Sequence, residues 1–266
     1  MSDILRRSLA PLTEAAWKEI DRTASNILKA SLTGRKLVDC DGPHGLELGA
    51  VNLGRLAIPE KHKRAGVSWG VREVLPLVEL RVPFQLDQME LDSISRGSKD
   101  VDLGPLEKAA RAVVDFEESA IYKGFPEARV QGILKAAKHA PLKIPAARED
   151  CPKAVAEGIK LLSEAGIEGP YALVLCLECY HELIATAKGY PTFRVAERLV
   201  EGGIFYSSAL KGGVLLSVRG GDFELTLGQD ISIGFSGCTA DKVELYFAES
   251  FTFRVLEPLA AVELKP

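Results

Sequence analysis

Two cysteines three positions apart are the residues most capable of metal or redox chemistry. Cys176 and Cys179 can share a zinc ion through their thiolates or cycle between dithiol and disulfide. The sequence offers no second ligand pair, and His181 falls one position too late for the Cys-x-x-Cys-His pattern of haem attachment. Because Cys176 ends an apolar run, we interpret both as packed thiols, with a metal or redox site as the alternative.

The histidines and glycines do not form a recognisable catalytic motif. His44, His62 and His139 fall in polar loops and His181 in an expected helix, none of them beside a Gly-x-Ser-x-Gly motif. The sequence contains no Gly-x-x-x-x-Gly-Lys phosphate loop and no Gly-x-Gly-x-x-Gly motif after a strand, so its glycine pairs indicate turns. We therefore predict no catalytic residue, no nucleotide site and no enzymatic activity.

Two pairs of carboxylates have the residue types that general acid–base catalysis or metal binding requires. They are Glu117 with Glu118, and Asp100 with Asp102. Neighbouring charged residues on a helix normally face solvent, because burying a charge is costly unless it is paired. We expect both pairs to lie on solvated surfaces, and we predict no metal site.

Composition and charge exclude several functional classes. The chain has 266 residues, with 33 basic and 37 acidic side chains and a net charge of -4, so no basic stripe favours nucleic acid. No apolar run reaches the roughly 18 residues that span a bilayer, and no signal-peptide core precedes Thr13. Five cysteines, an odd number in mostly apolar surroundings, indicate reduced thiols. We expect a cytoplasmic protein that binds neither membranes nor nucleic acid.

Hydrophobic periodicity predicts the helices that would position any site. An amphipathic helix follows Thr13, and Gly34 is its expected stop. Further helices are predicted from Pro105 to Gly124, from Asp150 to Ala165, over 178–188 and over 191–200. The first helix needs a surface against which its apolar side can pack.

Alternating and β-branched runs predict the strands. Residues 46–84 read as a long hairpin, and its polar centre at 60–66 is expected to project from the body. A buried strand is predicted over 171–176, and a meander over 223–227, 243–247 and 251–255. This pattern indicates an α+β fold, and its projecting parts favour assembly with partners over catalysis.

Ordered segments spread over essentially the whole chain carry a resemblance to a known family. They are Arg7–Thr13, Gly34–Asp39, Glu90–Gly97, Gly166–Tyr171, Arg219–Phe223 and Gly228–Gly234. Together these segments resemble the encapsulin shell proteins, the linocin or bacteriocin-like group.

The resemblance implies the tailed-phage major capsid fold of the Hong Kong 97 type. It places an N-terminal arm and helix over 1–41 and an extended loop over 42–84. A peripheral domain over 85–130 and 223–266 and an axial domain over 131–222 complete it. The resemblance also implies a homo-oligomer that closes into an icosahedron of about sixty copies.

The function that the resemblance implies is confinement of a cargo protein. Family shells enclose ferritin-like, peroxidase or rubrerythrin-like proteins that carry a short targeting peptide, and they control access of iron or other small molecules. The shell itself is not an enzyme. The alternatives are a stand-alone bacteriocin or protease-like enzyme and a prophage capsid protein.

The resemblance also carries over candidate binding residues. The cargo-peptide candidates are Leu28, Arg35, Asp39, Asp230, Ile231, Ile233 and Phe235. Apolar members of this set would bury peptide anchors, while the charged ones would fix its ends or backbone. The alternative is that Leu28, Ile231 and Ile233 are plain core and that Arg35 pairs with Asp39.

Two further segments match family sites. The loop over 187–191 falls where the family lines its fivefold pore, which makes Lys188, Gly189 and Tyr190 pore candidates, with a plain surface loop as the alternative. Some relatives stack a flavin on a Trp where this chain has Met89. Since Met offers no flat stacking platform, we expect no flavin cofactor.

Overall fold

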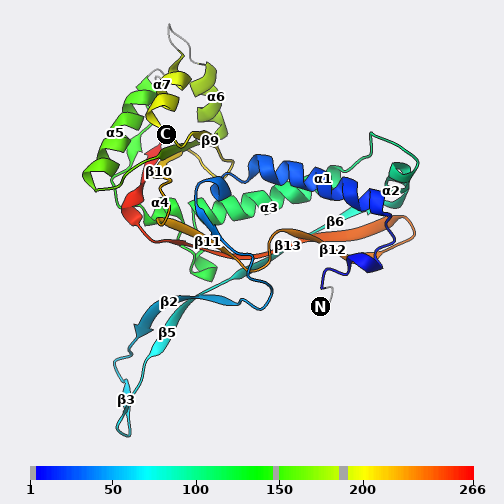
Figure 1. The fold of residues 1–266 in the computed structure, drawn as a ribbon, viewed down its shortest axis with the longest axis horizontal. Helices are drawn as coiled ribbons and strands as arrows, with labels where there is room; N and C mark the ends of the chain where they lie inside the picture. Colours follow the sequence, from blue (N-terminus) through cyan, green and yellow to red (C-terminus); the bar gives the residue numbers. More distant parts are fainter. Residues whose placement is uncertain (1–3, 146–149, 186–190) are drawn as a thin grey trace.

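Two five-stranded sheets, each covered by helices, make up the body of the protein, and a long hairpin projects from it (Figure 1). The computed structural model describes residues 4–145, 150–185 and 191–266. The predicted α+β class is thus confirmed for these residues.

The first sheet is built around one long strand, β13 (Lys242–Val255). Strand β6 (Val78–Asp87) pairs antiparallel along one edge of β13, and β12 (Ser232–Cys238) and β11 (Phe223–Leu227) follow each other along the opposite edge. Strand β1 (Asp39–Asp41) adds in parallel to β11. Sequence alternation predicted two separate strands over 243–255, whereas the structure has one continuous strand, because residues 248–250 keep the period of two.

Two helices that run side by side in the same direction lie over one face of this sheet (Figure 1). Helix α1 (Glu14–Ser31) starts where the Thr13 hydroxyl accepts from Ala16 N–H, and it buries Ile20 and Ala24 against α3 (Gly104–Tyr122). Helix α2 (Gln88–Ser95), which sequence periodicity missed, follows β6 directly. The predicted helices after Thr13 and from Pro105 are confirmed.

The second sheet lies at the other end of the body. Its strand order is β7 (Leu142–Lys143), β14 (Ala261–Lys265), β10 (Gly213–Ser217), β8 (Tyr171–Leu175) and β9 (Ile204–Tyr206). Helices α4 (Ile133–Ala136), α5 (Cys151–Glu164), α6 (Leu177–Ala185) and α7 (Thr192–Leu199) accompany this sheet. The expected helix near Asp150 and the buried strand at Tyr171 are confirmed.

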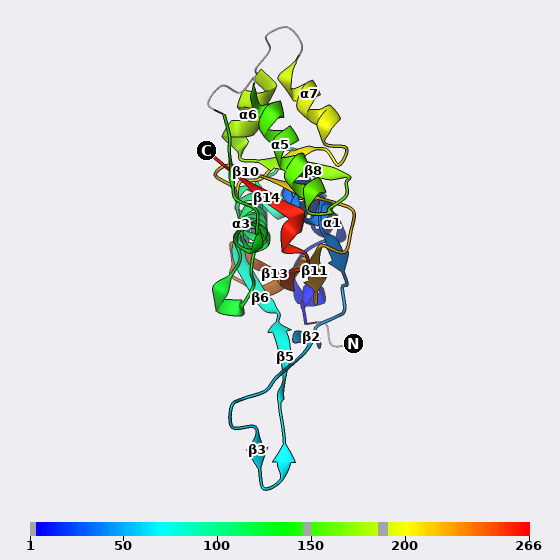
Figure 2. The same cartoon turned by 90° about the vertical axis from the view of Figure 1, so that its left-hand side faces the viewer.

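The projecting hairpin consists of β2 (Ala50–Ala57) and β5 (Val71–Pro76), with β3 (Lys63–Arg64) and β4 (Val67–Ser68) at its tip. Figures 1 and 2 show it extending away from both sheets. The hairpin expected over 42–84 ends earlier in the structure. Residues 78–84 belong to the first sheet, because Leu80 and Phe84 are buried under its helices.

Candidate functional site

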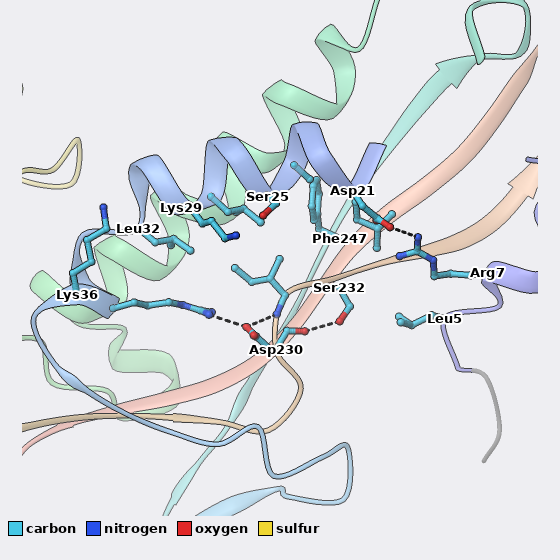
Figure 3. A pocket seen from close by; sticks show the side chains of 15 residues that line it. Leu5, Arg7, Asp21, Ser25, Lys29, Leu32, Lys36, Asp230, Ser232 and Phe247 are labelled. Atoms are coloured by element: carbon cyan, nitrogen blue, oxygen red, sulfur yellow. Dashed lines mark hydrogen bonds and ion pairs between the residues drawn. The ribbon is translucent and has the colours of Figure 1, made fainter. Parts of the chain in front are cut away.

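An apolar groove of about 650 Å³ runs between helix α1 and strand β12 (Figure 3). Its lining side chains come from α1, from the loop after it, from the N-terminal segment and from the first sheet. The apolar ones are Leu5, Ala24, Leu28, Leu32, Ile231, Ile233 and Phe247. Charged side chains surround these apolar residues, and among them Asp21 forms an ion pair with Arg7 at 2.7 Å. Lys29 and Lys36 also line the groove.

A short 3-10 turn, η2 (Gly34–Lys36), brings Arg35 to one end of this groove. The turn is clamped to α3, because Gly34 N–H donates to Glu118 Oε1 at 2.6 Å and the Thr33 hydroxyl donates to Glu118 Oε2. Gly34 is buried, and a Cβ there would stand 2.7 Å from Ile121 Cδ1, so any larger residue would have to displace the buried Ile121 side chain. These contacts with α3 therefore fix the position from which the Arg35 side chain extends.

The Arg35 guanidinium binds three carboxyl groups. Its Nε and Nη2 donate to Glu117 at 2.6–3.0 Å, Nη2 also donates to Glu249 at 2.5 Å, and Nη1 donates to Asp230 Oδ1 at 2.7 Å. Burial disfavours the charged guanidinium, but the hydrogen bonds and charge of Glu117, with the charge of Glu249, prevail and raise the pKa of Arg35. The arginine is therefore a permanently charged part of the groove wall.

Glu117 and Glu118 are completely buried, so the expectation that they face solvent is wrong. They occupy apolar-face positions of α3, each four residues after a buried valine, Val113 or Val114. Glu118 accepts hydrogen bonds from Thr33, Gly34 and Ser207, although burial raises its pKa. The ion pair of Glu117 and the hydrogen bonds of Glu118 offset the free-energy cost of burying both carboxyl groups.

Glu249 is a site residue that sequence analysis missed. It faces the core in the same alternating row of β13 as Phe247 and Phe251, and its side chain is fully buried. That parity was the available signal, because a charged residue between two inward-facing aromatic residues must have a buried partner. Burial, with the charge of Glu117 and a hydrogen bond to it, raises the pKa of Glu249 well above its usual range.

The structure brings five predicted residues together in the groove: Leu28, Arg35, Asp230, Ile231 and Ile233. Asp39 instead lines a smaller pocket beside the glycine turn after β10, where it accepts from Gly221 N–H at 2.6 Å. Phe235 lines a third pocket with Ile4 and Tyr246. The alternative pairing of Arg35 with Asp39 is wrong, since Arg35 binds other carboxylates. Whether these residues bind a peptide stays a prediction.

The remaining candidates for chemistry do not form a site. Cys176 and Cys179 are both buried, as the packed interpretation expected. In the described residues no three His, Cys, Asp or Glu side chains are placed to hold a metal ion, and no helix is long and apolar enough to cross a bilayer. Met89 is 70% exposed on α2. The pore candidates Lys188, Gly189 and Tyr190 lie outside the described residues.

Comparison with known proteins identifies the family of the chain. Residues 1–252 match the family described as an encapsulating protein for peroxidase. The chain is 42% identical to a type 1 encapsulin shell protein of Rhodospirillum rubrum, covering 100% of this chain and 97% of that protein. The corresponding shell protein of Rhodococcus erythropolis is 40% identical, with 98% of each chain covered. This chain belongs to the type 1 encapsulin shell proteins.

Solved structures agree on the fold of this encapsulin. A virus-like particle from Pyrococcus furiosus has a TM-score of 0.64 at 18% identity, covering 92% of this chain and 98% of that one. The capsid of Myoviridae Phage XM1 has a TM-score of 0.52 at 14% identity, covering 88% and 91%. The predicted tailed-phage capsid fold is confirmed, and the encapsulin chain is a shell protein of capsid-like architecture.

Proposed function

We propose that this chain is the subunit of a closed icosahedral shell that encloses a cargo enzyme, and that the groove between α1 and β12 binds the targeting peptide of that cargo. One observation carries the peptide proposal. Apolar side chains line a groove whose end holds an acidic group, Asp230, fixed by Arg35 and half exposed. Such a groove favours binding of an extended peptide segment that has apolar side chains followed by a hydrogen-bond donor.

The backbone of β12 supports an extended occupant. Phe235 N–H donates to Leu5 carbonyl at 2.8 Å, on the side of β12 away from β13. Because an antiparallel ladder alternates, the N–H and carbonyl of Ile233 point to that same open edge. A peptide strand could add there while its side chains enter the groove.

The family description supports a first choice of cargo to test. The matching family is described as encapsulating a peroxidase, so a peroxidase is the first cargo to test, before ferritin-like and rubrerythrin-like proteins. In this proposal the shell does no catalysis and carries no flavin at Met89. Small substrates, iron among them, would pass through pores lined by the 187–191 loops of about sixty subunits in a cytoplasmic compartment.

Co-expression tests the proposal. The chain would be produced with the protein encoded beside its gene, once intact and once without its C-terminal segment, and particles would be examined by negative-stain electron microscopy. We expect uniform closed particles in both cases, and we expect cargo inside them only when the partner is intact. Particles that exclude the intact partner would contradict cargo binding, and a soluble monomer or dimer would contradict the shell.

A further inference from the structure

Four of the five N–H groups of Arg35 are engaged within the chain. Nε and Nη2 bind Glu117, Nη2 binds Glu249, and Nη1 binds Asp230. To turn its Nε or Nη2 towards a peptide, Arg35 would have to leave two buried carboxyl groups, which is strongly unfavourable. Asp230 uses Oδ1 for Arg35 and for Ile231 N–H, which leaves Oδ2 available to the groove. The peptide-facing group is therefore Asp230, and Arg35 holds it in place.

Ionising both of the buried carboxyl groups that bind Arg35, Glu117 and Glu249, is energetically unfavourable. Glu117 and Glu249 are both fully buried, and together with Asp230 they would place three negative charges around one guanidinium. Glu249 Oε2 is buried without a hydrogen-bond donor. A proton on Glu249, donated in a hydrogen bond to Glu117, satisfies that oxygen and removes one charge.

We propose that Glu117 and Glu249 share one proton and are positioning residues for peptide docking, because they hold Arg35, which in turn fixes Asp230 at the groove. This inference rests on the proposed peptide-binding function of the groove. Neither glutamate touches the peptide. Their effect passes through the chain of contacts from β13 and α3 to η2 and then to the β11–β12 loop.

The arrangement makes docking sensitive to rising pH. The charged groups that act on Glu249 are Glu117 on α3, Arg35 on η2 and Asp230 before β12, while Glu118 on α3 and Cys40 on β1 lie within electrostatic reach of Glu117. When rising pH removes the shared proton, Glu249 and Glu117 repel each other across Arg35. The folded protein holds this proton until pH reaches the raised pKa of Glu249, so the Arg35 anchor weakens as pH rises through that pKa.

Three variants and a matched control separate this role from a merely structural one. Glu249→Gln copies the neutral carboxyl group, Glu249→Leu removes its hydrogen bonds, and the double variant Glu117→Gln/Glu249→Gln leaves Arg35 without a buried anion. Glu224→Gln is the control, because Glu224 pairs with Arg254 outside the groove. Assembled shells would be titrated between neutral and alkaline pH with a labelled peptide copying the C-terminal segment of the neighbouring gene's product.

We expect wild type and Glu224→Gln to lose affinity together as pH rises, while Glu249→Gln binds as wild type at neutral pH and keeps its affinity. Glu249→Leu and the double variant should bind at least about tenfold more weakly at every pH, as loss of charge-assisted hydrogen bonds predicts. Superimposable pH profiles for wild type and Glu249→Gln, or undiminished binding by Glu249→Leu, would overturn the proposal.

A second readout needs no peptide and separates this inference from the proposed function. Hydrogen–deuterium exchange of residues 229–233 reports the bond from Ile231 N–H to Asp230. We expect protection in wild type and Glu249→Gln at neutral pH, and faster exchange in Glu249→Leu and the double variant. If wild type binds no peptide, the proposed function fails, yet this exchange pattern still supports the positioning role; identical exchange in all variants overturns it.

Discussion

Ile231, in the loop before β12, and Leu28, on α1, both line the groove, and neither is required by the core as Ile20 or Phe247 is, because both remain partly exposed. Ile231→Asp should therefore abolish cargo loading while the shell still assembles, since an unpaired charge in an apolar groove costs several kcal/mol of peptide binding. The check is the amount of cargo that co-purifies with intact particles.

Ile231→Val is the matched variant, because it keeps an apolar surface and removes a single methylene group. It should retain cargo loading. If Ile231→Asp loads cargo as well as Ile231→Val does, the groove is not the docking site.

Gly34 offers a test of how the groove is positioned. A Cβ at this residue would stand 2.7 Å from Ile121 Cδ1 and 3.2 Å from Glu118 Oε1. Gly34→Ala should cost about 1–3 kcal/mol of stability, as overpacking does, and should weaken peptide binding by displacing Arg35. Thermal unfolding measures the first effect. Gly49→Ala is the control, since its Cβ would meet nothing within 4 Å, and equal melting temperatures for the two variants would contradict this account.

The buried charges mark the limit of sequence reasoning at single residues. Glu117 and Glu118 look like a solvated pair because neighbouring carboxylates usually are. Their partners, Arg35, Thr33 and Ser207, lie 82 or more positions away in the chain, so no local pattern reveals them. Three of the apolar groove residues, Leu28, Ile231 and Ile233, were found by family resemblance, whereas Glu249 required the parity of a strand to be followed through residues 248–250.

Secondary structure was largely predictable because helices and strands here bury one regular face each. Helix α1, with its Thr13 cap, and α3, with Pro105 near its start, are examples. The two features that sequence analysis predicted wrongly, helix α2 and the end of the hairpin, have local causes. Helix α2 has only one buried residue, Leu91, so its periodicity is weak. The end of the hairpin at Pro76 could not be read because the strand pattern continues without interruption into β6.

The projecting hairpin exposes apolar side chains that a monomer leaves in water. Leu56, Ile58, Val67, Trp69 and Val71 are 44–64% exposed. Apolar residues on an arm far from the core indicate a partner surface. Replacing residues 58–70 with Asn-Gly joins Ala57 to Val71, which already face each other in the β2–β5 ladder.

This shortened chain should fold with unchanged melting temperature but fail to form particles, because the removed tip packs against neither sheet (Figure 2). Size-exclusion chromatography with light scattering distinguishes the outcomes. Glu60→Ser, a polar change at the exposed tip, should leave assembly intact. Closed particles from the shortened chain would show that the hairpin is not an assembly element.

At the scale of the whole molecule, the fold and the groove have different origins. Two sheets, two covering helices and a projecting arm form the capsid fold, which the chain shares with a virus-like particle at 18% identity and with a phage capsid at 14%. The groove that we propose as a ligand site lies on that scaffold at strand β12, which in the described residues pairs with another strand along one edge alone. Topology of this kind cannot be derived from periodicity, which gives elements but not their neighbours.

The central claim is that a shell of this chain holds its cargo by a peptide in the α1–β12 groove. The most direct measurement is a cryo-electron microscopy reconstruction of shells co-expressed with the neighbouring gene's product. The account predicts a closed icosahedral shell with an extended segment of density along Ile231 and Ile233, ending beside Asp230. A closed, cargo-filled shell with an empty groove would contradict it.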